Sequence, residues 1–441
     1  SSGSRRKTGP VIFHKYLIRI SDVIPHMDLR GILDSIDGSR EDIAKMMCEM
    51  VSIPSISPAA GGNGEAERAD FLMTCLDGFD SIERVDVPDK SDSKILRSNI
   101  LARKNGKDKG TVWIIAHIDT VPAGNLDDWK TDPFKGVYRD GRVYGRGTED
   151  NGQSVISSIF ATKFIEKGKL EGKSIGIALV ADEEMASEYG VVYLIDHGYF
   201  SADDIFLVPD WGSPEGRYIE VNEKSLIWLQ FEVTGRSVHA STPDKGVNAF
   251  KVGTALITDL VNTFNKKFGY EDPLFMPPRS SFEPTKASAT VLNVNTIPGS
   301  WSFCMDIRVV PKYNVDEVYE VAKEVVAKHI KSTNAYIEVR EIQRHISGGP
   351  SSQESDTYKA LCSAVESVTR HRPKAVAVGG ATCANFFRLK GYDAYVWECG
   401  GGTLHGPNEY VELDNLITDA KVFATLFYNI CVNRWNGDNV N

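Results

Sequence analysis

Three short hydrophobic runs in the first half of the chain have the pattern of buried strands. They cover residues 111–116 (TVWIIA), 174–181 (SIGIALVA) and 204–209 (DIFLVP). Nearly continuous apolar runs of this length are typical of a sheet covered on both faces. A helix is predicted over 153–168, between the first two runs. Strands that alternate with helices predict an α/β fold with a doubly wound mixed sheet, whose ligands lie beyond the carboxyl ends of the strands.

Weaker signals extend this unit at both ends. Ser39 begins a segment with the form of a helix N-cap, and apolar residues recur behind it at helical spacing until Pro54. A second helix is expected to end near Gly78. The other elements predicted for this unit are a strand over 99–103, a helix over 353–370, a strand over 394–397 and a helix over 413–432.

The pattern changes between residues 223 and 345. Strand, helix, strand, strand, helix and strand are predicted there in turn, over 226–234, 248–268, 288–296, 301–310, 314–332 and 335–342. This order is that of a compact ferredoxin-like unit, whose antiparallel sheet leaves an edge for a second copy. We therefore expect a main domain in two parts, 27–222 and 346–441, with the unit at 223–345 inserted between them. Residues 1–26 are expected to be an N-terminal extension that is partly vector-derived.

Composition narrows the class of protein. A chain of 441 residues with 41% hydrophobic and 25% charged residues is that of a soluble globular protein with about two domains. The net charge of −10 argues against nucleic acid or an anionic membrane as the partner. No apolar run approaches the roughly eighteen residues of a membrane span. Seven dispersed cysteines without a C-x-x-C pair are typical of reduced thiols in a cytoplasmic protein.

Acids and histidines follow each of the three predicted strands. His117 and Asp119 follow the first, and the two-residue period of a strand puts them on the same side. Glu183 and Glu184 follow the second strand, and Asp210 follows the third. Because the ends of parallel strands meet at one edge of a sheet, we expect these side chains to converge there.

Imidazole and carboxylate groups in this number predict a hydrolytic centre with two divalent metal ions, Zn²⁺ or alternatively Co²⁺ or Mn²⁺. Asp150, just ahead of the helix at 153–168, is the expected bridging ligand. We expect Glu183 to be the general base beside the metal-bound water and Asp119 to orient the ring of His117. The expected terminal ligands are His117, Glu184, Asp210 and His405, the last in a glycine-rich loop.

Three of these ligands also have a structural interpretation. Asp150 can cap the following helix, and Asp210 can belong to a turn before Gly212. His117 can be a histidine satisfied at the end of a core strand. Asp150 can cap the helix and bridge two metals at once, so its structural role and its ligand role are compatible.

An ordered set of motifs from about Ile43 to the C-terminus resembles the dinuclear zinc metallopeptidase and deacylase family. That family includes glutamate carboxypeptidase, acetylornithine deacetylase, succinyl-diaminopimelate desuccinylase, aminoacylases and carnosinase-like dipeptidases. The matching motifs are H-I-D (117–119), D-P-F (132–134), G-R-V-Y-G-R-G-T-E-D (141–150), D-E-E (182–184), P-D (209–210), G-R-S-V-H-A-S-x-P (235–243) and H-G-P-N-E (405–409).

The resemblance implies the metal and base roles given above and a homodimer formed through the inserted unit, which also acts as a lid. It implies that His239 reaches the active site of the opposite subunit to stabilise a tetrahedral intermediate. Asn248 and Arg308 match positions that bind the amide oxygen or carboxylate of the substrate, and Gly380 lies in the matching substrate-carboxylate loop. The implied reaction is hydrolysis of the amide bond of a small N-acyl amino acid by a metal-activated water, with Glu183 as base.

Three departures from the family pattern bear on the substrate. Asn151 replaces a basic residue that many deacylases have, and Cys383 replaces an aspartate of the carboxylate loop. Asp210 stands where deacylases usually have glutamate, which is typical of the dipeptidase and aminopeptidase branch. A dipeptidase or aminopeptidase therefore stays open, and Arg308 can instead be a solvated residue of the sheet. A non-catalytic binding protein is disfavoured, because the ligand set is complete.

Overall fold

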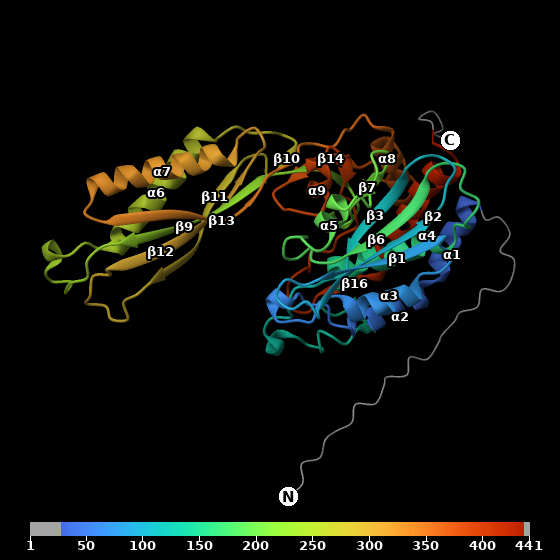
Figure 1. Ribbon diagram of the computed structural model, residues 1–441, viewed down its shortest axis with the longest axis horizontal. Coiled ribbons are helices and arrows are strands. Elements are labelled where there is room, and N and C mark those ends of the chain that lie inside the picture. Colours follow the sequence, from blue (N-terminus) through green and yellow to red (C-terminus); the bar gives the residue numbers. More distant parts are fainter. Residues whose placement is uncertain (1–27, 436–441) are drawn as a thin grey trace, which may run out of the picture.

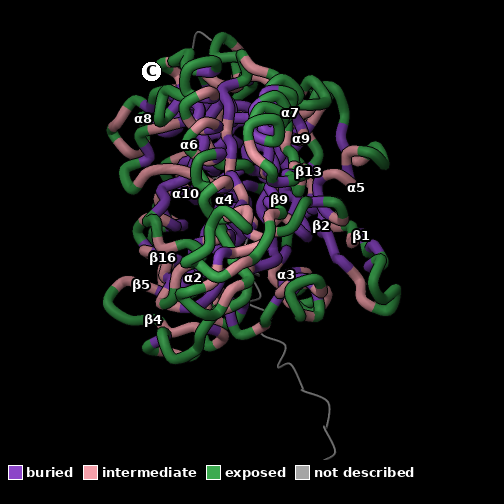
Figure 2. Tube along the Cα trace, turned by 90° about the vertical axis from the view of Figure 1, so that its left-hand side faces the viewer, coloured by how far each residue is buried: buried purple, intermediate pink, exposed green. Residues whose placement is uncertain are grey.

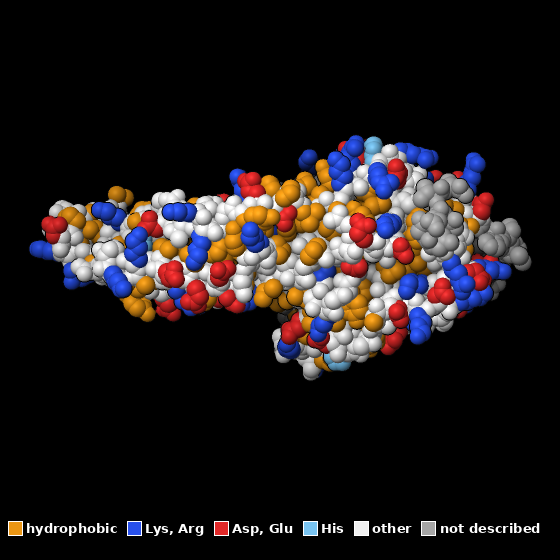
Figure 3. All heavy atoms as spheres, turned by 90° about the horizontal axis from the view of Figure 1, so that it is seen from above, with side chains coloured by type: hydrophobic (Ala, Val, Ile, Leu, Met, Phe, Trp, Pro, Cys, Tyr) orange, Lys and Arg blue, Asp and Glu red, His pale blue; other side chains and the backbone are white. Residues whose placement is uncertain are grey.

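The structure is a computed structural model that describes residues 28–435, and in it the chain is elongated with two lobes (Figures 1 and 3). The larger lobe is an α/β body around a mixed sheet. The smaller lobe is an antiparallel sheet with two helices on one face. The expected extension over residues 1–26 lies outside the described residues.

The central sheet of the body carries the predicted hydrophobic strands in its middle. Its strands, in spatial order, are β1 (Ser81–Pro88), β2 (Leu96–Lys104), β6 (Ser174–Val180), β3 (Thr111–His117), β7 (Ile205–Leu207) and β15 (Ala394–Tyr395). Strand β3 runs parallel to both β6 and β7, whereas β2 is antiparallel to β1 and to β6. The ends of β3, β6 and β7 therefore lie at one edge.

Helices cover both faces of this sheet. In β3, Ile114 packs into one hydrophobic core, while Trp113 and Ile115 pack into a second core on the opposite face. The helices α1 (Leu29–Gly38), α2 (Arg40–Val51), α3 (Ala66–Cys75), α4 (Gln153–Lys163), α8 (Asp356–Thr369) and α10 (Leu413–Phe427) contribute to the first core, and α5 (Val191–Asp196) and α9 (Ala384–Leu389) to the second. Burial on both faces explains why residues 112–116 of β3 are all apolar. Figure 2 shows the buried residues gathered in the interior, with exposed residues around them.

Two small sheets accompany the central sheet. One contains β10 (Phe275–Met276), β14 (Lys374–Val378) and β8 (Tyr218–Glu223), and the other β16 (Tyr410–Glu412), β5 (Arg142–Tyr144) and β4 (Val137–Arg139). Strand β16 pairs with β5, and Gly145 N donates to Glu409 O at 3.0 Å. This pairing brings the C-terminal glycine-rich loop against the segment that contains Asp150.

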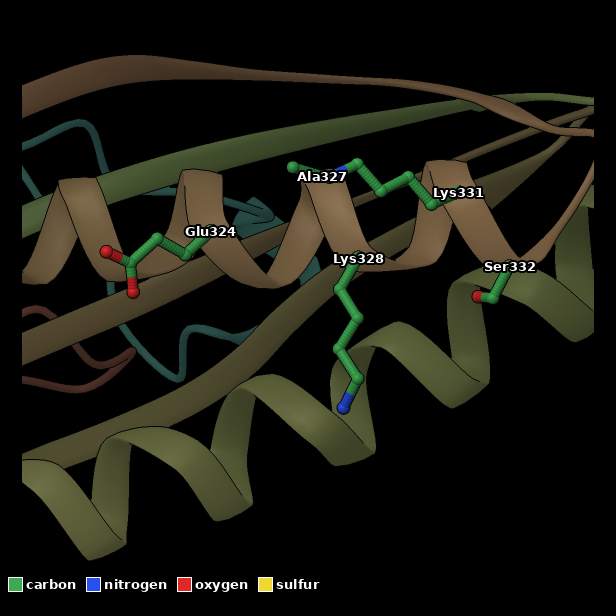
Figure 4. A pocket seen from close by; sticks show the side chains of 5 residues that line it. All are labelled: Glu324, Ala327, Lys328, Lys331 and Ser332. Carbon is green, nitrogen blue, oxygen red and sulfur yellow. The ribbon is translucent and has the colours of Figure 1, made fainter.

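The smaller lobe follows the predicted order of strands and helices. Its sheet has the order β11 (Ser281–Ala289), β12 (Ser300–Val309), β9 (Ser225–Thr234) and β13 (Tyr336–His345), covered by α6 (Ala249–Lys267) and α7 (Val315–Ser332). Phe231, Leu256 and Phe303 lie in its separate core. A shallow depression along α7 is lined by Glu324, Ala327, Lys328, Lys331 and Ser332 (Figure 4). These residues lie in the lobe that lacks the metal-ligand candidates.

The predicted strand over 288–296 is wrong. The observed strand β11 ends at Ala289, and the side chains of Leu292 and Val294 are fully exposed. Alternating apolar residues there imitate a strand, whereas Pro284 makes the true strand look broken. Proline is tolerated because β11 is an edge strand with a register irregularity after Pro284.

Element boundaries differ elsewhere by small amounts. The predicted strand over 394–397 is shortened to β15, and the closing helix is regular only to Phe427. Strand β1 and the strands of both small sheets were not predicted. Most strands of the small sheets are too short to carry a periodic signal. Within residues 28–435 no helix is long and apolar enough to cross a membrane.

Candidate metal centre

The carboxyl ends of β3, β6 and β7 bring the predicted side chains together. His117 is the last residue of β3, Glu183 and Glu184 follow β6, and Asp210 follows β7. Asp150 lies in the irregular turn that precedes α4. The neighbouring strands place these groups at one edge of the sheet, as the sequence predicts.

Two groups of potential ligand atoms share one carboxylate. His117, Asp150 and Asp210 form the first group, and Asp150, Glu184 and His405 form the second. In each group the ligand atoms lie within 4.8 Å of one another. All five residues predicted as ligands are thus brought together, and Asp150 is the member common to both groups.

The two oxygens of Asp150 face different imidazoles. Oδ1 lies 2.8 Å from His117 Nε2, and Oδ2 lies 3.0 Å from His405 Nε2. His117 Nε2 is also 3.4 Å from Asp210 Oδ1, and His405 Nε2 is 3.1 Å from Glu184 Oε2. A carboxylate flanked in this way has the disposition that a bridging ligand requires.

Asp119 organises the site through both its backbone and its side chain. Its carbonyl oxygen lies 3.1 Å from His117 Nδ1 and accepts from that nitrogen in the tautomer that leaves Nε2 free. The carboxylate is farther from the ring, at 3.5 Å. It also accepts from the amides of Glu183 and Glu184, at 3.0 and 3.1 Å. Asp119 is thus close enough to orient the ring of His117, as predicted, and its carboxylate also holds the loop that follows β6.

Charge crowding perturbs the protonation of these groups. Burial lowers the pKa of His117, but hydrogen bonds with Asp119, Asp150 and Asp210 raise it well above its ordinary value. Hydrogen bonds with Asp150 and Glu184 raise the pKa of His405 to about 10. Burial, followed by the charge of Asp210, raises the pKa of Glu183 well above its usual range. The cluster therefore retains protons in order to limit repulsion between carboxylates.

The chemistry of the donor set fits divalent cations. Four carboxylates and two imidazoles meet there, so the acidic groups outnumber the imidazoles among the described residues. Glu184 Oε1 is buried and has no hydrogen-bond partner among the described residues. A cation near this oxygen would satisfy it and would replace the protons that the two histidines otherwise supply.

Three supporting residues were not assigned a role from the sequence. Asn151 accepts from His117 N at 3.2 Å and donates to Asp210 Oδ1 at 3.0 Å, so it joins the ends of two strands. Glu409 accepts from the amides of Glu149 and Asp150 at 3.0 and 3.1 Å. Glu149 accepts from the loop before His405. In the sequence, only the adjacent acids Glu149 and Asp150 indicate that Glu149 lies near the site.

His239 and Asn248 are not brought to the metal ligands within one chain. Both follow β9, which begins at Ser225 next to the body and ends at Thr234 at the far end of the smaller lobe (Figure 1). His239 is exposed and its Nδ1 lies 2.7 Å from Ser241 Oγ. Asn248 caps α6 by accepting from Lys251 N at 3.0 Å. The chain itself therefore gives both residues local roles.

Arg308 and Gly380 are brought together at the junction of the lobes. Arg308 lies near the end of β12 that is closest to the body, and its Nη1 donates to Gly379 O at 2.5 Å. Its other nitrogens donate to both oxygens of Asp306. Gly380 is exposed and has open space around its Cα. The guanidinium is therefore half-buried and paired, and is not simply solvated.

Comparison with known proteins defines the class. The model of peptidase family M20/M25/M40 matches residues 113–429. A metallohydrolase of Methanocaldococcus jannaschii is 35% identical over 404 residues, covering 87% of this chain and 98% of that protein. The chain therefore belongs to peptidase family M20/M25/M40 and is a metal-dependent hydrolase.

The more distant matches are to proteins of two kinds. Succinyl-diaminopimelate desuccinylase of Nautilia profundicola is 23% identical over 407 residues, covering 90% of this chain and all of that protein. The crystal structure of human carnosine dipeptidase 1 matches with a TM-score of 0.71 at 20% identity, covering 90% of this chain and 98% of that one. At this identity the structural match shows the fold alone.

Proposed function

We propose that the chain hydrolyses the amide bond of a small N-acyl amino acid. The observation that carries this proposal is the sharing of Asp150 by two potential metal sites, with Glu183 beside them. His117, Asp150 and Asp210 would hold one divalent cation, and Asp150, Glu184 and His405 the other. When bound, two such cations, Zn²⁺ or alternatively Co²⁺ or Mn²⁺, supply a Lewis acid for the scissile carbonyl and lower the pKa of water.

Glu183 is the proton carrier of the proposed reaction. Its Oε2 lies 4.0 Å from His117 Nε2, and Glu183 belongs to neither of the two groups of potential metal ligands. It takes a proton from the attacking water and delivers it to the leaving nitrogen as the C–N bond breaks, which yields a carboxylic acid and an amine. A raised pKa suits a group that must both accept and donate this proton. Such a base contributes about 10²- to 10⁴-fold in rate.

Arg308 and the loop at Gly379 and Gly380 support a substrate with a free carboxylate. The guanidinium lies beside this exposed loop at the junction of the lobes. A paired guanidinium can still recognise a carboxylate through donors directed at the substrate. Gly380 leaves open space in which an anion can approach the backbone.

The proposed domain arrangement follows from the same reasoning. Residues 27–222 and 346–441 form the catalytic domain, and residues 223–345 form a ferredoxin-like lid that also makes a homodimer. His239 would act in the active site of the partner, which its exposure and its distance from its own ligands support. Asn248 would bind substrate in the same way. We place the enzyme in the cytoplasm on the basis of its unpaired cysteines.

A dipeptidase is the second candidate, and Asp210 is the observation that favours it. Aspartate at this ligand position is typical of the dipeptidase branch, and the fold matches that of a carnosine dipeptidase. The two candidates differ in the group on the acyl side of the scissile bond, which is an amino acid in a dipeptide.

A substrate panel tests the function. N-succinyl and N-acetyl amino acids and dipeptides are incubated with enzyme that has been stripped by a chelator and reloaded with zinc, cobalt or manganese. The proposal expects metal-restored release of free amine, fastest with an N-acyl amino acid. Faster cleavage of dipeptides would favour the second candidate, and no metal-dependent hydrolysis of any amide would overturn both.

A further inference from the structure

Glu149, the neighbour of the shared ligand Asp150, has a buried carboxylate that no part of the reaction uses. Glu149 is 2% exposed. Oε1 accepts from the amides of Gly401 and Gly402 at 2.6 and 2.5 Å. Oε2 accepts from the amide of Thr403 at 2.6 Å and from its hydroxyl. Four donors from three consecutive residues therefore converge on one carboxylate.

The loop that donates these bonds carries His405. It includes Gly400, Gly401 and Gly402, and glycine loses more conformational freedom on ordering than any other residue. A Cβ on Gly401 would lie 3.4 Å from Glu149 Oε1, and Gly402 has φ +81°. The carboxylate thus lies within contact distance of the position that a Cβ at Gly401 would take, and a side chain at Gly402 would strain the backbone.

His405 is the least enclosed of the predicted ligands. Its side chain is 51% exposed, whereas that of His117 is 2% exposed. His117 is held by a buried strand, whereas His405 lies in a loop, where its carbonyl accepts from Arg146 Nη2 at 3.2 Å. The loop needs an internal anchor if Nε2 is to stay near Asp150 and Glu184.

Glu409 provides the return contact between the same two segments. It accepts from the amides of Gly147, Glu149 and Asp150, and it pairs with Arg146. Glu149 and Glu409 therefore form reciprocal clamps between the Asp150 turn and the His405 loop. The other ligands of the first position, His117 and Asp210, come from strand ends and lie outside these clamps.

We propose that Glu149 is a positioning residue that builds the second cation position, by holding the loop 401–403 and thereby His405 against Asp150. The inference rests on the proposed two-metal centre. It assigns Glu149 no contact with substrate or metal. Its effect should therefore be selective for the position that includes His405.

Metal titration of Glu149→Gln tests this selectivity. Glutamine keeps the size of the side chain but offers one acceptor oxygen to four donors. Chelator-stripped wild type and variant are titrated with Zn²⁺ by calorimetry, with thermal unfolding as a check of folding. We expect the variant to bind the first ion like the wild type and the second about 10- to 100-fold more weakly.

A double-mutant cycle separates positioning from general damage. Adding Glu149→Gln to His405→Ala should cause no further loss of zinc affinity. Adding it to His117→Ala should weaken zinc binding by the same factor as adding it to the wild type. Equal affinities of wild type and Glu149→Gln for both ions would overturn the inference alone. A wild type that binds fewer than two ions would overturn both the inference and the two-metal centre.

Hydrogen exchange gives a readout that does not depend on metal. In stripped protein, the amides of Gly401, Gly402 and Thr403 should exchange at least about tenfold faster in Glu149→Gln than in wild type. Thr403→Val is the graded control, because it removes the hydroxyl, which contacts Glu149 and the Tyr410 backbone, but keeps the three amide donors to Glu149. It should have a smaller effect on exchange. Unchanged protection of these three amides would contradict the clamp.

Discussion

Asp119 fixes the position of Glu183 through a hydrogen bond between its Oδ1 and the Glu183 amide, 3.0 Å long. Its Oδ2 accepts from the Glu184 amide in the same way, at 3.1 Å. One carboxylate at the end of β3 thus holds both the proposed base and a predicted ligand at the end of β6. The same residue accepts from His117 through its carbonyl, so it connects three functional side chains.

Asp119→Asn should therefore impair both turnover and metal binding. Asparagine has one acceptor oxygen, so one of the two amides faces an NH₂ group and the loop shifts. We expect kcat/KM and zinc affinity to fall by about 10- to 100-fold. Asp204→Asn is a matched control, because Asp204 accepts from Thr111 and Trp113 at the opposite end of β3. A comparable loss of zinc affinity in the control would show that the effect is a general one.

Glu183→Gln should separate chemistry from metal binding. The amide cannot carry the proton, while the predicted ligands stay in place. Turnover should fall by about 10²- to 10⁴-fold with two metal ions still bound per chain. Rates come from amine release, and metal content comes from elemental analysis of protein purified without chelator. Normal turnover by this variant would remove Glu183 from the proposed mechanism.

Complementation tests the proposed role of His239 in the partner. His239→Ala and Glu183→Gln are each expected to be nearly inactive. In a mixed dimer, the site with an intact Glu183 receives an intact His239 from the other chain. Random pairing on co-expression should restore about a quarter of the wild-type activity. Activity no greater than the average of the two variants would exclude the shared site.

Much of this site could be predicted because its ligands follow hydrophobic strands. His117, Glu184 and Asp210 stand directly after runs whose burial is evident from composition, and parallel pairing brings such ends together. The support around Asp150 could not be predicted in the same way. Glu149 and Glu409 contact segments about 250 residues away, and the hydrogen bonds involve backbone amides that any residue type supplies.

In the fold, too, the elements that could be predicted are those that depend on their own sequence and not on distant contacts. Because β3 is buried on both faces, its sequence is a continuous apolar run that can be recognised without the structure. In β11 the edge position that tolerates Pro284 is a property of the assembled sheet, so local pattern misplaced the strand at 288–296. Placement of His239 relative to a partner likewise depends on contacts that one chain does not contain.

Stability should depend on pH through Asp419, which is buried beneath the site. Burial raises its pKa to about 7, although Gln153 and Cys399 donate to it. Between its ordinary pKa of about 4 and that value, the folded chain keeps a proton that the unfolded chain has lost. The stability contributed by this group is therefore present at low pH and falls as the pH rises through that window.

Asp419→Asn removes this titration. Compared with wild type, the variant should gain about 1–3 kcal/mol in free energy of unfolding between pH 5 and pH 8. Urea unfolding of both proteins at the two pH values measures the difference. A difference that is the same at both values would mean that Asp419 is ionised throughout.

The central claim is that two cations share Asp150, and anomalous diffraction from crystals grown with zinc tests it most directly. The account predicts two anomalous peaks roughly 3.5–4 Å apart. One should lie at His117 and Asp210, the other at Glu184 and His405, and both should contact Asp150. A single peak, or peaks that do not share Asp150, would contradict the account.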